Sequence, residues 1–223
     1  ADPDEIPDFH WMDAPGWTCT DDYRQIACHY RLLVDNLLDL SHESFVHTAT
    51  IGHAALAEAP IESRREDDLI RIERIVPDCS PPPLFAKAFK FEGNIDRYQI
   101  IRHQAPSFIW IDARAVPAGS NDLDSGLRWE VLHALTPATA DATHYFWGLS
   151  RHFKQDDGDL TEMLHAATER TFDEDTDVLE TQHSMMKSDR PNHPMIHVDA
   201  DRGVVLARRL LEERFAAARA GDS

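Results

Sequence analysis

The sequence is poor in cysteine and in basic residues, and each shortage excludes a class of protein. Its 223 residues include three cysteines and no C-x-x-C pair, so neither a disulfide framework nor a zinc knuckle is expected. Lysine and arginine number 22 against 40 aspartates and glutamates, which gives a formal net charge of −18. Nucleic acids and anionic membranes bind basic surfaces, so neither is expected as a partner.

Long apolar runs are missing too. No stretch approaches the roughly 20 apolar residues of a membrane span. The first residues show no basic segment followed by an apolar one, so no signal peptide is predicted, and a reducing cytoplasm is the expected compartment. Residues 1–20 are rich in proline, aspartate and tryptophan and do not begin with methionine. We interpret them as a linker that follows another domain, and residues 21–223 as the functional domain.

The hydropathy pattern predicts an α+β fold. A short strand is expected at residues 23–30, and a helix begins near Leu32 and runs through residue 47. Short turns then separate runs that alternate or are rich in β-branched residues, which is typical of an antiparallel meander. These runs are 68–76, 95–103, 107–116, 127–135 and 142–150. Prolines 81–83 predict a loop into an edge strand. Two helices, at about 160–186 and 201–218, follow the strands, with prolines in residues 189–194 between them.

Residues 35–47 contain side chains that can bind or orient a metal. On a helix, Asn36, Asp39 and His42 lie on one side, and Asp35 shares a face with Asp39 and His42. His47 follows His42 by five residues, one too many for the H-E-x-x-H motif of zinc proteases. An ideal helix would hold the two imidazoles roughly 140° apart. Both can bind one metal only if the helix ends or distorts between them.

The long C-terminal helix offers a third ligand. Asp175 falls in the middle of its apolar stripe, and a buried carboxylate requires a cation as its partner. The stripe consists of Leu160, Leu164, Phe172, Val178, Leu179 and Met186, and the neighbouring acids that fall outside it are Asp173, Glu174, Asp177 and Glu180. Two histidines and one carboxylate form the facial triad that is typical of non-haem Fe(II) oxygenases. The alternatives are ordinary histidines and a carboxylate that forms a salt bridge.

One further histidine is predicted to face the apolar side of a strand. His133 alternates in phase with Trp129, Val131 and Leu135. It is either a buried histidine bonded to a backbone carbonyl or a polar group in an apolar pocket that can bind an anionic or phenolic ligand.

Residues 34–52 (VDNLLDLSHESFVHTATIG) resemble the iron-binding segment of Rieske-type aromatic oxygenases, in the branch of the vanillate and dicamba O-demethylases. Segments 6–17, 135–153 and 172–182 agree, so the resemblance covers nearly the whole chain. It implies a helix-grip fold (START/Bet v1-like), in which a curved antiparallel sheet surrounds a long C-terminal helix.

The resemblance also implies roles for individual residues. His42, His47 and Asp175 would bind the mononuclear iron. Asp39 would link His42 to a cluster histidine of a neighbouring subunit, and Asn36 would lie beside the iron.

Three further residues correspond to the substrate pocket of the family. His133 matches a histidine that binds a substrate carboxylate. Ser107 and Ala166 stand where the dicamba enzyme has an asparagine and a tryptophan, so dicamba itself is not the expected substrate. The implied reaction is O₂-dependent O-demethylation or hydroxylation of a small, vanillate-like aromatic compound.

The family implies cofactors and partners beyond this chain. They are a [2Fe–2S] Rieske cluster, a ferredoxin or flavin reductase that draws on NAD(P)H, and assembly as a homotrimer. The cluster motif requires C-x-H and C-x-x-H, which this sequence does not contain. We therefore expect the cluster on a missing N-terminal domain, and no turnover by the chain alone. The alternative function is a helix-grip module that binds a small apolar or aromatic ligand without catalysis, and bound iron distinguishes the two.

Overall fold

A seven-stranded antiparallel sheet forms the body of the protein. The computed structural model describes residues 6–48, 50–52, 54–188 and 196–221. The strands are β1 (Thr18–Ile26), β2 (Ile61–Glu66), β3 (Leu69–Cys79), β4 (Ile95–Gln104), β5 (Phe108–Pro117), β6 (Leu127–Thr139) and β7 (Ala142–Arg151). Their order across the sheet is β1-β7-β6-β5-β4-β3-β2. Apart from the placement of β1 beside β7, each strand therefore pairs with the next along the chain, as expected for a meander.

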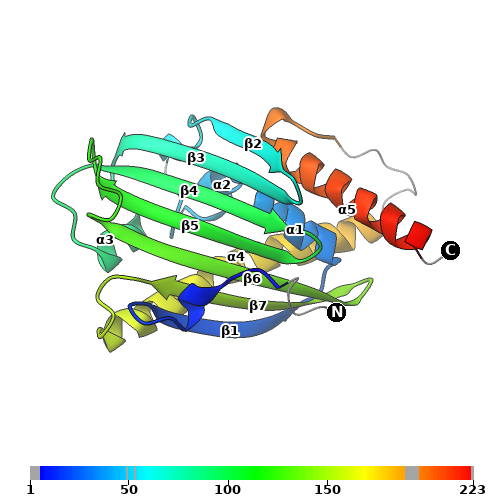
Figure 1. Cartoon of the computed structure of the whole chain (residues 1–223), viewed down its shortest axis with the longest axis horizontal. Coiled ribbons are helices and arrows are strands. Elements are labelled where there is room, and N and C mark those ends of the chain that lie inside the picture. The colour runs from blue at the N-terminus through cyan, green and yellow to red at the C-terminus, as the bar shows by residue number, and fades with distance from the viewer. Residues whose placement is uncertain (1–5, 49, 53, 189–195, 222–223) are drawn as a thin grey trace.

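The helices lie on one face of this sheet. They are α1 (Tyr30–Leu38), α2 (Glu43–Val46), α3 (Pro83–Ala88), α4 (Gly158–Ser188) and α5 (Arg202–Gly221). Figure 1 shows the curved sheet with α4 crossing behind it and α1 between α4 and the sheet. Short 3₁₀ turns occur at His10–Met12, Ala54–Leu56 and Asp199–Asp201. The fold is the helix-grip that the sequence predicted.

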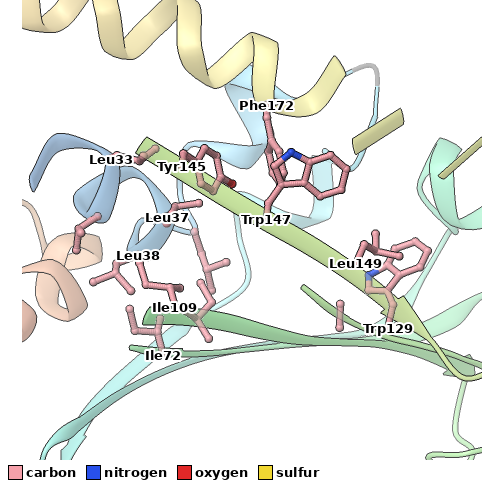
Figure 2. Packing of buried hydrophobic residues seen from close by; sticks show 14 of the residues in the cluster. Leu33, Leu37, Leu38, Ile72, Ile109, Trp129, Tyr145, Trp147, Leu149 and Phe172 are labelled. Atoms are coloured by element: carbon pink, nitrogen blue, oxygen red, sulfur yellow. The ribbon is translucent and has the colours of Figure 1, made fainter. Parts of the chain in front are cut away.

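The core forms where α1 and α4 meet the sheet. Strand β4 alternates strictly between buried and partly exposed side chains, so its odd-numbered residues face the helices. From α4, Phe172 packs on Tyr145 and Trp147 of β7, with ring centroids 5.5 Å apart in both pairs. Figure 2 shows these three rings together, with the leucines of α1 above the strands. Helix α4 is thereby fixed to the sheet at the level where its acidic residues lie.

Several boundaries differ from those predicted. Strand β1 begins at Thr18, so the last residues of the segment interpreted as a linker belong to the sheet. Residues 83–88 form α3, with Pro83 at its first turn, where proline is tolerated. The edge strand predicted after the prolines, within residues 84–91, is therefore absent, and the next strand is β4, which begins at Ile95. Strand β2 was not predicted, because it is a charged and largely exposed edge strand.

The apolar stripe of α4 is also narrower than predicted. Leu160, Leu164, Phe172 and Leu179 are buried, whereas Val178 and Met186 are 45% and 48% exposed. In residues 181–188 all side chains except His183 are exposed, because nothing in the described structure covers this end of α4. The proline-containing segment 189–194 lies outside the described residues. None of the described helices combines the length and the apolar content that a membrane span requires.

Candidate metal centre

The helix predicted through residue 47 is broken before His42, and the second helical segment ends between His42 and His47, as a shared metal requires. Helix α1 ends at Leu38, Asp39 takes an extended conformation (φ −93°, ψ 98°), and the short helix α2 follows. His42 lies immediately before α2 and His47 immediately after it. As a result the two imidazoles face each other, with their Nε2 atoms 3.1 Å apart.

Helix α4 brings Asp175 to the same point. Its Oδ1 lies 3.5 Å from Nε2 of His42 and 3.2 Å from Nε2 of His47. Asp175 and His47 are 5% and 2% exposed. One nitrogen from each ring and one carboxylate oxygen thus converge within 4.8 Å of one another. This donor set is that of a facial triad, so the residues fit a divalent first-row metal such as Fe(II).

The two most buried groups, Asp175 and His47, stabilise each other's charged form. Burial raises the pKa of Asp175, but His47 and His42 outweigh it and lower the pKa overall. Burial conversely lowers the pKa of His47, but Asp175, with Glu174 contributing, holds it above its usual value. Among the described residues no lysine or arginine pairs with Asp175. The carboxylate therefore depends on the two histidines, or on a cation between them, for its compensation.

Each candidate ligand has a further hydrogen-bond partner, which for the two histidines lies on the ring nitrogen that faces away from the centre. His47 Nδ1 lies 2.8 Å from Oε2 of Glu174, and His42 Nδ1 contacts the backbone carbonyl of Asp39. Asn36 Nδ2 donates to Asp175 Oδ1 at 3.0 Å. Such contacts fix the tautomer and the orientation of metal-binding histidines.

Two acids of the motif lie differently from expectation. The carboxylate of Asp39 does not contact His42 but accepts hydrogen bonds from the backbone and hydroxyl of Ser41, at 2.7 and 2.6 Å. The reason is that α1 ends before Asp39, so the side chain leaves the helical face. Asp35 also turns away from His42 and forms an ion pair with Arg208 of α5.

Glu174 is the residue of the centre that sequence reasoning missed. Its position lies off the apolar stripe of α4, so the sequence pattern does not distinguish it from the neighbouring acids. Its side chain nevertheless reaches back to His47 and is only 27% exposed. A glutamate next to a predicted carboxylate ligand was the available indication, because metal-bound histidines usually bond to a second carboxylate.

A cavity of about 570 Å³, part of it open to solvent, adjoins the metal centre. Glu43, which follows His42, and Phe172, one helical turn before Asp175, both line it. The remaining walls are mostly apolar and aromatic and come from α3, α4 and strands β4–β7. They comprise Ile51, Leu84, Phe85, Arg97, Gln99, Ile111, Ala113, Trp129, Val131, His133, Leu149, Thr168 and Thr171.

His133 is one of the residues that line this cavity. Its Nδ1 lies 2.6 Å from the Tyr145 hydroxyl, so its partner is not a backbone carbonyl. Its Nε2 is buried and has no partner among the described residues. Burial lowers the pKa of His133 to about 3, which keeps the ring neutral. Burial also raises the pKa of Tyr145, so its hydroxyl keeps its proton.

The two other residues predicted for the pocket are not among its described lining residues. Ser107 lies in the turn between β4 and β5, where its carbonyl accepts from Leu135 at 3.1 Å. Ala166 lies on the exposed side of α4. The inward-facing wall of β5 starts after the turn, and Ile111 and Ala113 are its cavity residues.

Comparison with known proteins identifies the family. Residues 26–217 match the vanillate O-demethylase oxygenase C-terminal domain. The chain is 33% identical over 232 residues to the vanillate O-demethylase oxygenase subunit of Pseudomonas sp. (strain ATCC 19151), covering 100% of this chain and 70% of the relative. It is 31% identical over 231 residues to the toluene-4-sulfonate monooxygenase system iron-sulfur subunit of Comamonas testosteroni, with 100% and 66% covered.

Solved structures agree. Dicamba monooxygenase bound to 3,6-dichlorosalicylic acid superimposes with a TM-score of 0.91 at 29% identity, over 98% of this chain and 65% of that one. The chain thus spans about two thirds of the length of these relatives. It belongs to the family of vanillate O-demethylase oxygenase C-terminal domains, the catalytic domains of Rieske-type oxygenases.

Proposed function

We propose that this domain is the catalytic part of an oxygenase component that demethylates or hydroxylates a small, vanillate-like aromatic compound with O₂. The observation that carries the proposal is the convergence of His42, His47 and Asp175 beside a largely apolar cavity. The relatives named vanillate O-demethylase and dicamba O-demethylase support removal of a methyl group from an aromatic ether. A structure of dicamba monooxygenase that holds non-haem iron supports iron as the metal.

Fe(II) held by His42, His47 and Asp175 would supply the activation of O₂. The contacts behind these residues prepare the centre for it. Glu174 and the carbonyl of Asp39 orient the two rings, so that both Nε2 atoms point inward. Asn36 holds the carboxylate of Asp175 in place. These contacts would limit the reorganisation that catalysis requires.

The cavity residues orient the substrate. Tyr145 keeps its proton and is buried, and His133 is the one hydrogen-bond partner of its hydroxyl among the described residues, so it would donate to Nδ1 of His133. The proton of the neutral imidazole would then reside on Nε2, as a donor for an oxygen of a substrate in the cavity. Aromatic walls such as Trp129 and Phe172 exclude water from the methyl group that reacts.

The remaining parts of the system are also proposals. Electrons would come from NAD(P)H through a reductase and a [2Fe–2S] cluster on a preceding domain, because this sequence has no cluster motif. Asp39 would face the cluster of a neighbouring subunit in a homotrimer. The three cysteines are free thiols, which supports a reducing, cytoplasmic location.

Iron loading tests the proposal directly. Anaerobic incubation with Fe(II), followed by elemental analysis, should give one iron per chain. His47→Ala and Asp175→Ala should lose it, whereas His144→Ala, a histidine bonded to Tyr23 on another part of the surface, should retain it. Absence of iron together with tight uptake of an apolar ligand would instead favour the binding-module alternative.

Turnover forms the second test. The iron-loaded chain with a methoxybenzoate, O₂, NADH and a reductase should give no formaldehyde, whereas the same domain joined to a Rieske domain should. Formaldehyde that depends on an added 2-oxo acid would contradict the proposal, because it would identify a co-substrate-dependent oxygenase.

A further inference from the structure

A cluster of buried charges lies at one end of the cavity and is not used by the metal centre. It consists of Glu43 from α2, Arg74 from β3, and Arg97 and Gln99 from β4. Arg74 and Arg97 donate through Nη2 to Oε2 of Glu43, at 2.7 and 3.3 Å. Gln99 Nε2 donates to Oε1 at 2.6 Å. All four side chains are buried.

The charges of this cluster do not balance. Two guanidinium groups surround one carboxylate, which leaves one buried positive charge. The thiol of Cys79 beside Arg97 does not neutralise it, because burial raises the pKa of that thiol. A buried charge without compensation costs several kcal/mol. An anion supplied from outside the chain would remove this cost.

Arg97 also has a donor to spare. Arg74 uses all of its nitrogens, which donate to Gln99, Glu43 and the carbonyl of Leu40. Arg97 donates through Nη1 to a backbone carbonyl, that of Ile51, and through Nη2 to Glu43. Its Nε is buried without a partner among the described residues, although Arg97 is 2% exposed and lines the cavity. Charge and hydrogen bonding therefore both point to an anionic ligand.

The position of Arg97 suits the end of an aromatic ligand. Its guanidinium lies 4.9 Å from the ring centre of Phe85, another wall residue. In the sheet, Gln99 pairs with Ala113, which pairs with Trp129, so a small side chain leaves space beside the indole. Arg97 is in register with Ala115 and, through it, with Leu127 of β6. His133 lies six residues beyond Leu127, roughly 20 Å along the strand. The cavity thus has a cationic end and a neutral donor end, with apolar walls between.

We propose that Arg97 forms an oxyanion subsite, which anchors a carboxylate or sulfonate of the aromatic ligand through its free Nε–H. Glu43 and Arg74 hold Arg97 in position. The anion then binds away from His133, whose Nε2–H is left for a phenolic or ether oxygen. This assignment rests on the proposed function only in taking the cavity as the substrate site, since binding itself requires no iron.

Calorimetric titration of the whole metal-free chain with 4-methoxybenzoate and its uncharged analogue 4-methoxybenzamide tests the proposal. A hydrogen bond to a charged group is worth about 1.5–3 kcal/mol, so the wild type should bind the benzoate about 10- to 100-fold more tightly. Arg97→Gln should abolish that preference by weakening benzoate binding, with a much smaller loss of benzamide affinity. Glu43→Gln should strengthen benzoate binding, because it removes the negative charge of the cluster. Arg102→Gln, on the opposite face of the same strand, should change neither affinity.

Several results would overturn the proposal. One is equal affinity of the wild type for the two ligands, which needs no variant to fold. Another is equal loss of both affinities in Arg97→Gln, which would assign Arg97 a structural role. If Arg97→Gln does not fold, two other measurements test the proposal. They are the ratio of benzoate to benzamide affinity in the wild type and the expected gain in benzoate affinity in Glu43→Gln. Iron content is measured separately. If the chain binds iron but does not prefer the benzoate, only the subsite is contradicted. If it prefers the benzoate but binds no iron, only the proposed function is contradicted.

Discussion

Replacing Glu174 with glutamine measures how far the metal centre depends on the contact behind His47. The Glu174 carboxylate lies 2.8 Å from His47 Nδ1 and is 27% exposed. Loss of such an outer partner typically weakens metal binding 10- to 100-fold. Glutamine keeps an oxygen that can accept the same hydrogen bond, and the partial exposure screens the lost charge. We therefore expect about tenfold weaker Fe(II) binding, or about 1.4 kcal/mol.

The assay is an anaerobic equilibrium competition for Fe(II) against a chromophoric chelator. Asp173→Asn is the matched control, because it removes the same charge from the adjacent position of α4. Asp173 is 73% exposed and pairs with Arg24 rather than with a histidine. Equal weakening in the two variants would show that net charge alone is responsible. Unchanged affinity in Glu174→Gln would show that His47 does not need this partner.

Three stability predictions concern the body of the fold, each measured by urea denaturation. Phe172→Ala should lower the free energy of unfolding by about 3 kcal/mol, because its ring packs on Trp147; a loss below about 1 kcal/mol would contradict this packing. Burial, with Asp112 nearby, raises the pKa of Glu130 to about 7. The folded protein therefore holds this proton more strongly than the unfolded chain does, and the stability that the group contributes at low pH is lost as the pH rises from about 4.5 to 7. Glu130→Gln should therefore be more stable than the wild type at pH 8 by roughly 3 kcal/mol at most, and no more stable at pH 4; a gain of equal size at both pH values would refute the reasoning. Burial lowers the pKa of His103 to about 4, so its contribution to stability is complete above about pH 6.5 and is lost as the pH falls toward 4. His103→Gln should therefore lose less stability than the wild type between about pH 6.5 and 4. An identical loss of stability in the two proteins would contradict this reasoning.

The fold was largely predictable because its strands and long helices carry regular patterns. Strands β4–β7 and helices α4 and α5 were predicted to within several residues, since alternation or helical periodicity is clear in each. Strand β2 escaped because it lies at an edge and four of its six residues are charged, so its sequence shows almost no apolar alternation. Helix α3 escaped because proline, which usually interrupts structure, is accepted at the first turn of a helix.

The candidate centre was predictable only in part. Asp175 could be identified because it is a lone acid in phase with an apolar stripe. His42 and His47 could be identified because two histidines in one segment can bind the same metal. The same reasoning applied to strands would have found Arg74 and Arg97, which lie in phase with buried isoleucines on β3 and β4. Their association with Glu43 could not have been predicted, because it depends on the strand register that sets Arg74 opposite Gln99.

Helices and the turn between them hold the three candidate metal ligands, whereas strands supply much of the cavity wall. Alternate side chains of a strand can be exchanged without moving its backbone. Substitutions at Ile111, Ala113 or Val131 would thus reshape the space that a ligand occupies while the segments that carry His42, His47 and Asp175 stay where they are. Laboratory evolution of new substrate preferences in this domain can therefore begin with libraries confined to β5 and β6, with chemistry and selectivity varied independently.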